Sequence, residues 1–120
     1  MKTFRKVAAQ GEITVRRIGS PSAAIPSGCV PLEPENGKLI IGHSETMHHH
    51  VLDRPAKVFT AKNAPSGMRV LYAIIEEPNA LVHERSFDTH EPLSLAPGIY
   101  EFRIGREFDP YAEIARQQAD

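Results

Sequence analysis

The sequence predicts an all-β fold, a small barrel or sandwich of about eight short strands followed by a short C-terminal helix. Apolar and polar residues alternate over short stretches, as they do in strands with one buried face. Turn-forming residues interrupt the chain often, since 8 glycines and 10 prolines lie among 120 residues. Long stretches with the period of an α-helix are missing before the C-terminal segment. Because this length suits one domain, we expect residues 1–120 to form a single β domain.

The predicted strands follow one another at short intervals. The first, Glu12–Ile18, alternates Ile13 and Val15 with polar residues. A connection over residues 19–35 holds four prolines, which would disrupt a helix or a central strand. The remaining strands are predicted at 38–41, 47–52, 56–60, 68–75, 80–83, 92–95 and 99–104. Residues 68–75 are the most apolar, which predicts a central strand with both faces covered.

Two further signals lie near the C-terminus. Ala96-Pro97-Gly98 has the residues of a type II turn, in which glycine takes the position that requires a positive φ. A helix is predicted over residues 109–119, because Asp109 can cap it and Pro110 suits the first helical position.

Histidine is the main compositional clue to function, with 6 in this short chain. Successive side chains of a strand alternate faces, so His48 and His50 share one face and His49 takes the other. Two imidazoles placed in this way can hold one metal ion. His43 lies at the start of the preceding turn and could supply a third ligand. Glu45, in the same turn, is the candidate proton shuttle if the protein is an enzyme, a point that the sequence leaves open.

A second polar group lies downstream, around His83 and His90. His83 ends one predicted strand and His90 precedes the next. If the sheet brings these ends beside residues 47–52, a site of three or four histidines forms. Imidazole-rich sites suit zinc and other divalent transition metals, and the sequence does not choose among them. The alternatives are that these histidines pack and hydrogen-bond within the sheet, or that they act in catalysis without a metal.

Charge, cysteine content and hydropathy limit the partners and the compartment that we expect for this protein. The 14 basic and 15 acidic residues give a net charge of −1, which argues against a general attraction to nucleic acid or an anionic membrane. The single cysteine, Cys29, excludes an intrachain disulfide, and the N-terminus lacks the apolar core of a signal peptide. No apolar stretch is long enough to span a membrane. We therefore expect a cytoplasmic protein.

The early strand Gln10-Gly11-Glu12-Ile13 and two later segments resemble a family of small bacterial and phage proteins with no assigned activity. The first is Gly42-His43-Ser44-Glu45-Thr46 with the histidines that follow it. The second is the ending Pro97-Gly98-Ile99-Tyr100-Glu101, followed by Arg106-Glu107-Phe108-Asp109-Pro110. This resemblance implies an origin in a bacterial chromosome, prophage or mobile element, and it implies no mechanism.

A partial resemblance to cupins, small β barrels that often hold a metal through histidines, rests on the spacing from Gly42 to His48 and His50. Asp53-Arg54-Pro55 stands where the first cupin motif expects its glutamate, and Glu101 stands at the place of the histidine of the second motif. The resemblance implies His48, His50 and Glu101 as metal ligands.

Three functions follow as expectations. The first is a metal-binding protein with His43, His48, His50, His83 and His90 as candidate ligands. The second is a non-catalytic accessory or virion-associated protein that contacts a protein partner or further copies of itself. The third is a nucleic-acid-binding module that uses the basic N-terminus. The first twenty residues contain one acidic residue and five basic ones, Lys2, Arg5, Lys6, Arg16 and Arg17.

Overall fold

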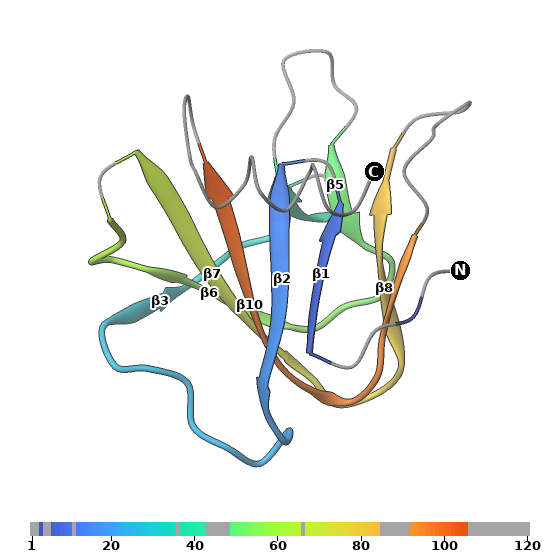
Figure 1. The fold of residues 1–120 in the computed structure, drawn as a ribbon, viewed down its shortest axis with the longest axis horizontal. Helices are drawn as coiled ribbons and strands as arrows, with labels where there is room; N and C mark the ends of the chain where they lie inside the picture. Colours follow the sequence, from blue (N-terminus) through green and yellow to red (C-terminus); the bar gives the residue numbers. More distant parts are fainter. Residues whose placement is uncertain are drawn as a thin grey trace.

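The structure is a computed structural model, and it describes residues 3, 6–10, 12–35, 37–42, 49–65, 67–84 and 92–105. The described residues form ten strands in two antiparallel sheets (Figure 1). The strands are β1 (Val7–Gln10), β2 (Ile13–Gly19), β3 (Cys29–Pro31), β4 (Leu39–Gly42), β5 (His50–Leu52), β6 (Lys57–Ala61), β7 (Met68–Ile75), β8 (Asn79–His83), β9 (Leu93–Leu95) and β10 (Gly98–Gly105).

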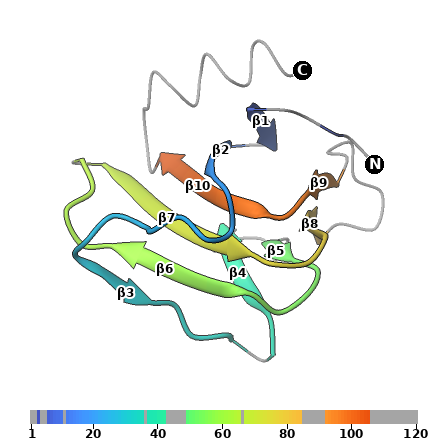
Figure 2. The ribbon, with the colours of Figure 1, turned by 90° about the horizontal axis from the view of Figure 1, so that it is seen from below.

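The larger sheet has the order β1-β2-β10-β7-β6-β3. Its two longest strands, β7 and β10, lie side by side in its interior, and Figure 2 shows β7 between β10 and β6. Leu71 and Ala73 on β7 are fully buried on one face, and Val70 and Tyr72 are almost as buried on the other. The predicted central strand with two covered faces is therefore confirmed.

The smaller sheet has the order β4-β5-β8-β9, and its register aligns one leucine from each strand. Leu39 pairs with Leu52, Leu52 with Leu81, and Leu81 with Leu93. This row of leucines packs into one buried cluster with Ile13 and other residues of the larger sheet. The two sheets therefore form a sandwich around a shared apolar core.

Alternate residues of β2, β7 and β10 in the larger sheet belong to this core. On β10 the core residues are Tyr100, Phe102 and Ile104, so Glu101 and Arg103 lie on the outer face of the sheet. The inward-facing end of β1 is Gln10, which pairs with the buried Ile13 and is itself 2% exposed. Gln10 is thus a polar side chain placed between the two sheets.

The all-β prediction is confirmed, and the structure corrects its details. The fold is a sandwich of two sheets and not a closed barrel, and the described residues contain ten strands instead of about eight. The two additional strands are edge strands, β1 and β3. The sequence Val7-Ala8-Ala9-Gln10 has little β-branched character, and β3 lies in the proline-rich connection, where Pro31 is tolerated because the strand is at an edge.

Two predictions near the C-terminus have different outcomes. Gly98 does not have a positive φ, so the predicted type II turn is wrong; positive φ values occur at Gly28, Gly37 and Gly67. Gly98 has a different role, because it leaves room for Arg17. A Cβ atom at this position would lie 2.5 Å from the Arg17 Nε atom and would collide with it. The predicted helix over residues 109–119 lies outside the described residues. Within the part of the chain that the structure describes, no helix is long and apolar enough to cross a membrane.

Candidate functional site

A pair of histidines lies at the end of the smaller sheet where β5 begins and β8 ends, the end toward which the β8 arrow points in Figure 1. His50 and His83 are direct cross-strand partners in the antiparallel register. Their rings stack, with centroids 4.2 Å apart and planes within 2° of parallel. The sheet thus joins two of the predicted ligands that lie far apart in the sequence.

The histidine pair faces the interior of the sandwich. His50 lies two residues before Leu52, and His83 two residues after Leu81, so both share the face of these core leucines. Both imidazoles are half-buried, and they continue the leucine row to the end of the sheet. The pair therefore lies at the opening between the two sheets.

Gln10 connects this pair to the larger sheet. Its Nε2 atom donates a hydrogen bond to the carbonyl oxygen of Leu81, at 2.9 Å. Its Oε1 atom lies 2.8 Å from the Nδ1 atom of His50. One buried side chain on β1 thus holds a backbone group of β8 and an imidazole of β5.

Gly42, at the end of β4, lets this end of the sandwich pack closely. It pairs with His50 across β4 and β5. A Cβ atom at this position would lie 2.8 Å from the Cδ1 atom of Ile13 and 3.5 Å from the Cδ2 atom of His50. Any larger residue would therefore push against the side chain of the buried Ile13.

The other predicted site residues, His43, Glu45, His48 and His90, lie outside the described residues. The strands on either side of these residues are described. Residues 43–48 connect β4 to β5, and residues 85–91 connect β8 to β9. Both segments leave the smaller sheet at the end that carries His50 and His83. Among the described residues alone, no group of three or more metal-ligating side chains comes together.

The ring geometry defines what the described pair can do with a metal ion. A ligating imidazole nitrogen directs its lone pair in the plane of the ring, toward an ion about 2.0–2.1 Å away. The lone pairs of two parallel stacked rings run in parallel planes and do not converge. Joint ligation by the two rings therefore requires at least one of them to tilt out of the stack.

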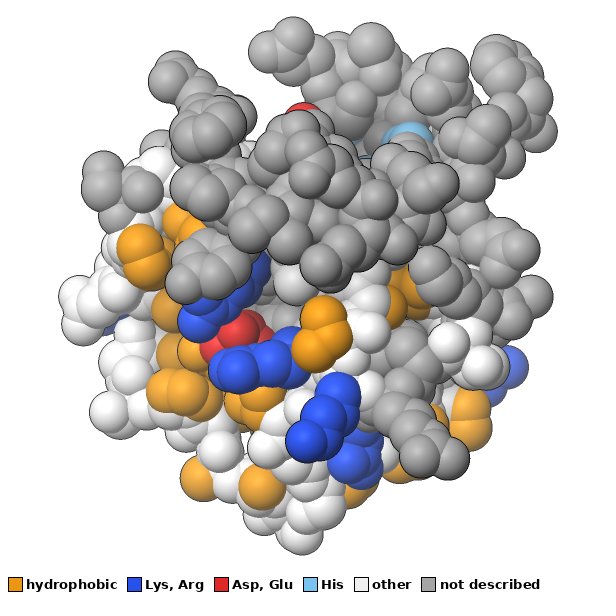
Figure 3. All heavy atoms as spheres, in the orientation of Figure 1, with side chains coloured by type: hydrophobic (Ala, Val, Ile, Leu, Met, Phe, Trp, Pro, Cys, Tyr) orange, Lys and Arg blue, Asp and Glu red, His pale blue; other side chains and the backbone are white. Residues whose placement is uncertain are grey.

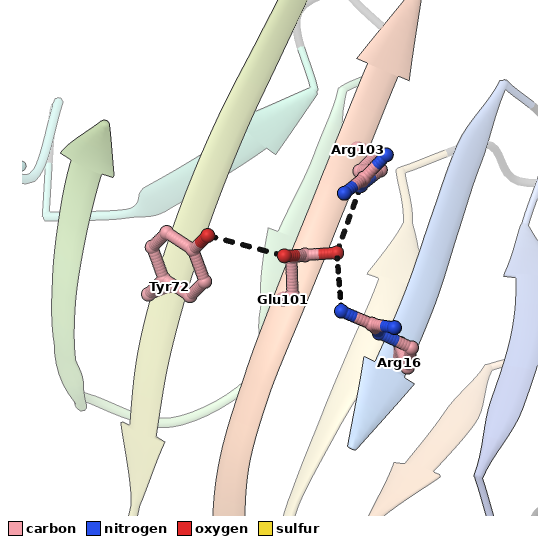
Figure 4. Close-up of polar contacts among 4 residues, drawn as sticks. All are labelled: Arg16, Tyr72, Glu101 and Arg103. Atoms are coloured by element: carbon pink, nitrogen blue, oxygen red, sulfur yellow. Dashed lines mark hydrogen bonds and ion pairs between the residues drawn. The ribbon is translucent and has the colours of Figure 1, made fainter. Parts of the chain in front are cut away.

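A second polar cluster lies on the outer face of the larger sheet and is centred on Glu101, which is 5% exposed (Figure 4). Its Oε1 atom accepts from the Arg103 Nε atom at 2.8 Å and lies 3.5 Å from the Arg16 Nη2 atom. Its Oε2 atom accepts from the Tyr72 hydroxyl at 3.1 Å. Burial and this carboxylate raise the pKa of Tyr72. Figure 3 shows acidic and basic side chains together on the described part of this face.

The position of Glu101 corrects the ligand set implied by the cupin resemblance. His50 faces the interior of the sandwich, whereas Glu101 lies on the outer face of the other sheet and is held by its own ion pairs. The carboxylate is therefore turned away from the histidine pair and cannot complete a site with it.

The same cluster bears on the basic N-terminus. Arg16 contacts Glu101, and Arg17 donates from Nη2 to the carbonyl oxygen of Pro97 at 3.0 Å. Two of the five basic residues on which the nucleic-acid hypothesis depends are therefore engaged within the chain.

A hollow of about 550 Å³ lies at the opposite end of the smaller sheet, between the connections that follow β5 and β7. Arg54, Lys57, Glu76 and Glu77 contribute charges of both signs to its lining. Asn79 fixes its shape, because its side chain accepts from the Arg54 amide at 2.9 Å and donates to the Arg54 carbonyl at 3.0 Å. The Asn79 amide therefore has a structural role, and no sequence pattern predicted the hollow.

The fold and the site define a small β-sandwich protein with a histidine pair at the opening between its sheets. A family model described as a domain of unknown function, DUF8820, matches residues 9–105, and the chain belongs to this family. The match includes Gln10, His50 and His83, and it agrees with the expected family without an assigned activity. It does not confirm the particular motifs or the cupin resemblance. No curated protein and no solved structure matches the chain significantly.

Proposed function

We propose that this protein binds a divalent transition-metal ion at the histidine end of the sandwich, with His50 and His83 as ligands. The observation that carries the proposal is the cross-strand pair itself, in which two imidazoles from different strands contact each other at a half-buried position. Imidazole is the commonest side-chain ligand for such ions.

The topology supports further ligands at the same place. The segments that carry His43, His48 and His90 begin and end on the strand ends next to the pair. His48 precedes His50 by only two residues. A site with three or four histidines, as imidazole-rich metal sites have, can therefore be assembled at this end of the sandwich.

The proposal is tested by calorimetric titration of protein purified without a tag, with zinc, nickel, manganese and ferrous ions. We expect binding tighter than about millimolar for at least one ion, and a higher melting temperature when that ion is present, because it binds the folded state. His50→Ala and His83→Ala should each weaken binding more than the roughly 10–100-fold typical of a change outside the ligands.

His49→Ala is the matched control. His49 adjoins the site, its carbonyl accepts from the Glu84 amide at 2.8 Å, and its side chain takes the opposite face from that of His50. Backbone contacts survive this substitution, so binding should change little. Failure of all four ions to bind more tightly than about millimolar would contradict the proposal and leave the histidines with a packing role.

A further inference from the structure

We infer that Gln10 is a positioning residue of this site. It holds His50 in the tautomer whose proton is on Nδ1 and whose lone pair is on Nε2. The role of this tautomer in ligation rests on the proposed metal-binding function. The tautomer itself is a property of the metal-free protein and can be measured without any metal.

The hydrogen bonds of Gln10 fix the direction of its amide. The carbonyl oxygen of Leu81 can only accept, so the atom of Gln10 that faces it must be the Nε2 donor. The other atom, Oε1, is then the one that faces His50. Turning the amide over would place two acceptor oxygens against each other in a buried position, which carries a penalty of at least one hydrogen bond.

The amide direction in turn fixes the imidazole. An amide oxygen can only accept, so the His50 Nδ1 atom, 2.8 Å away, must carry a proton and donate. In the neutral ring the second nitrogen, Nε2, then holds the lone pair. A ligating histidine characteristically donates its other ring N–H to an acceptor that orients it, and Gln10 fills this place.

Burial makes the arrangement stiff. Gln10 is 2% exposed, so water does not compete for its amide. It lies on β1 of the larger sheet, whereas its two partners lie on β5 and β8 of the smaller one. The orientation of His50 is therefore set by the packing of the two sheets.

The test is a two-bond proton–nitrogen correlation spectrum of the metal-free, isotope-labelled protein. It is recorded at about pH 8.5, two units above the ordinary histidine pKa of about 6.5. We expect His50 to show one tautomer, protonated at Nδ1. Gln10→Met removes the acceptor and should give a mixture of tautomers, with metal affinity about 10–100-fold weaker.

Gln10→Glu is the conservative variant, because a carboxylate still accepts from Nδ1 although it cannot donate to Leu81. It should restore the single tautomer, and circular dichroism checks that both variants fold. A wild-type His50 protonated at Nε2, or the same single tautomer in Gln10→Met, would overturn the inference whatever the titrations show. A locked tautomer in a protein that takes up no metal would instead overturn the proposed function and leave the role of Gln10 in setting the tautomer intact.

Discussion

Replacing Glu101 by glutamine removes the charge from a buried ion-pair cluster with almost no change in volume. The wild-type carboxylate uses one oxygen for Arg103 and Arg16 and the other for the hydroxyl of Tyr72. In Glu101→Gln the remaining oxygen stays with Arg103, so the amide nitrogen faces Tyr72. The tyrosine hydroxyl must then accept where it formerly donated, and its own proton loses a buried partner.

The size of the effect follows from these contacts. Hydrogen bonds to a charged group contribute about 1.5–3 kcal/mol and neutral ones about 0.5–1.5 kcal/mol, so the free energy of unfolding should fall by about 1–2 kcal/mol. Arg103 contacts the carboxylate at 2.8 Å and should couple to it by about 1 kcal/mol. Arg16 lies at 3.5 Å and is half exposed, so its coupling should stay below about 0.5 kcal/mol.

Urea unfolding followed by circular dichroism measures these energies, since the chain has no tryptophan to report by fluorescence. Two double-mutant cycles are needed, one combining Glu101→Gln with Arg103→Ala and one combining it with Arg16→Ala. Each cycle cancels the packing of the arginine side chain and leaves the coupling to the carboxylate. Equal stability of Glu101→Gln and wild type, or a stronger coupling to Arg16 than to Arg103, would refute the reasoning.

Two further predictions concern the core and the tyrosines. Leu71→Asp places an unpaired charge at a fully buried position, so circular dichroism should show an unfolded domain. The control Lys57→Asp, on the exposed start of β6, should change the free energy of unfolding by less than about 1 kcal/mol. A folded Leu71→Asp variant would show that the core is misassigned. Burial raises the pKa of Tyr72 and of Tyr100 above the ordinary value of 10.0, so the folded state holds these protons more tightly than the unfolded state. Their contribution to the free energy of unfolding is complete below pH 10 and is lost as pH rises above it, by at most about 1.4 kcal/mol per pH unit for each tyrosine. Urea unfolding from pH 9 to 11 should show that the double variant Tyr72→Phe and Tyr100→Phe loses stability less steeply with pH than the wild type. The same pH dependence in both proteins would be evidence against raised pKa values for these tyrosines.

The strands that could be predicted are those whose own residues carry the pattern. Met68–Ile75 is apolar on both faces, and this alone indicated its interior position. β1 and β3 carry no such signal, because β1 has little β-branched character and β3 lies in a proline-rich connection, so their conformations depend on pairing with β2 and β6. In the larger sheet, local sequence therefore predicts the interior strands better than the two edge strands.

The site divides in the same way. The histidines could be singled out by residue type and spacing. His50 and His83 were expected to meet only if the sheet brought the end of residues 80–83 beside residues 47–52. Gln10 could not be found, because a glutamine near the N-terminus becomes significant only when two sheets pack against it. The Glu101 cluster was missed for a similar reason, since its partners come from three different strands.

Pro31 has a consequence for self-association. The amide of Leu32 donates inward to Val58 at 2.8 Å, so the nitrogen of its neighbour Pro31 points away from β6, toward the open edge of the sheet. A strand arriving at this edge would meet a proline ring where the ladder needs a donor, on a template only three residues long. The larger sheet is thereby protected against the addition of a strand at β3.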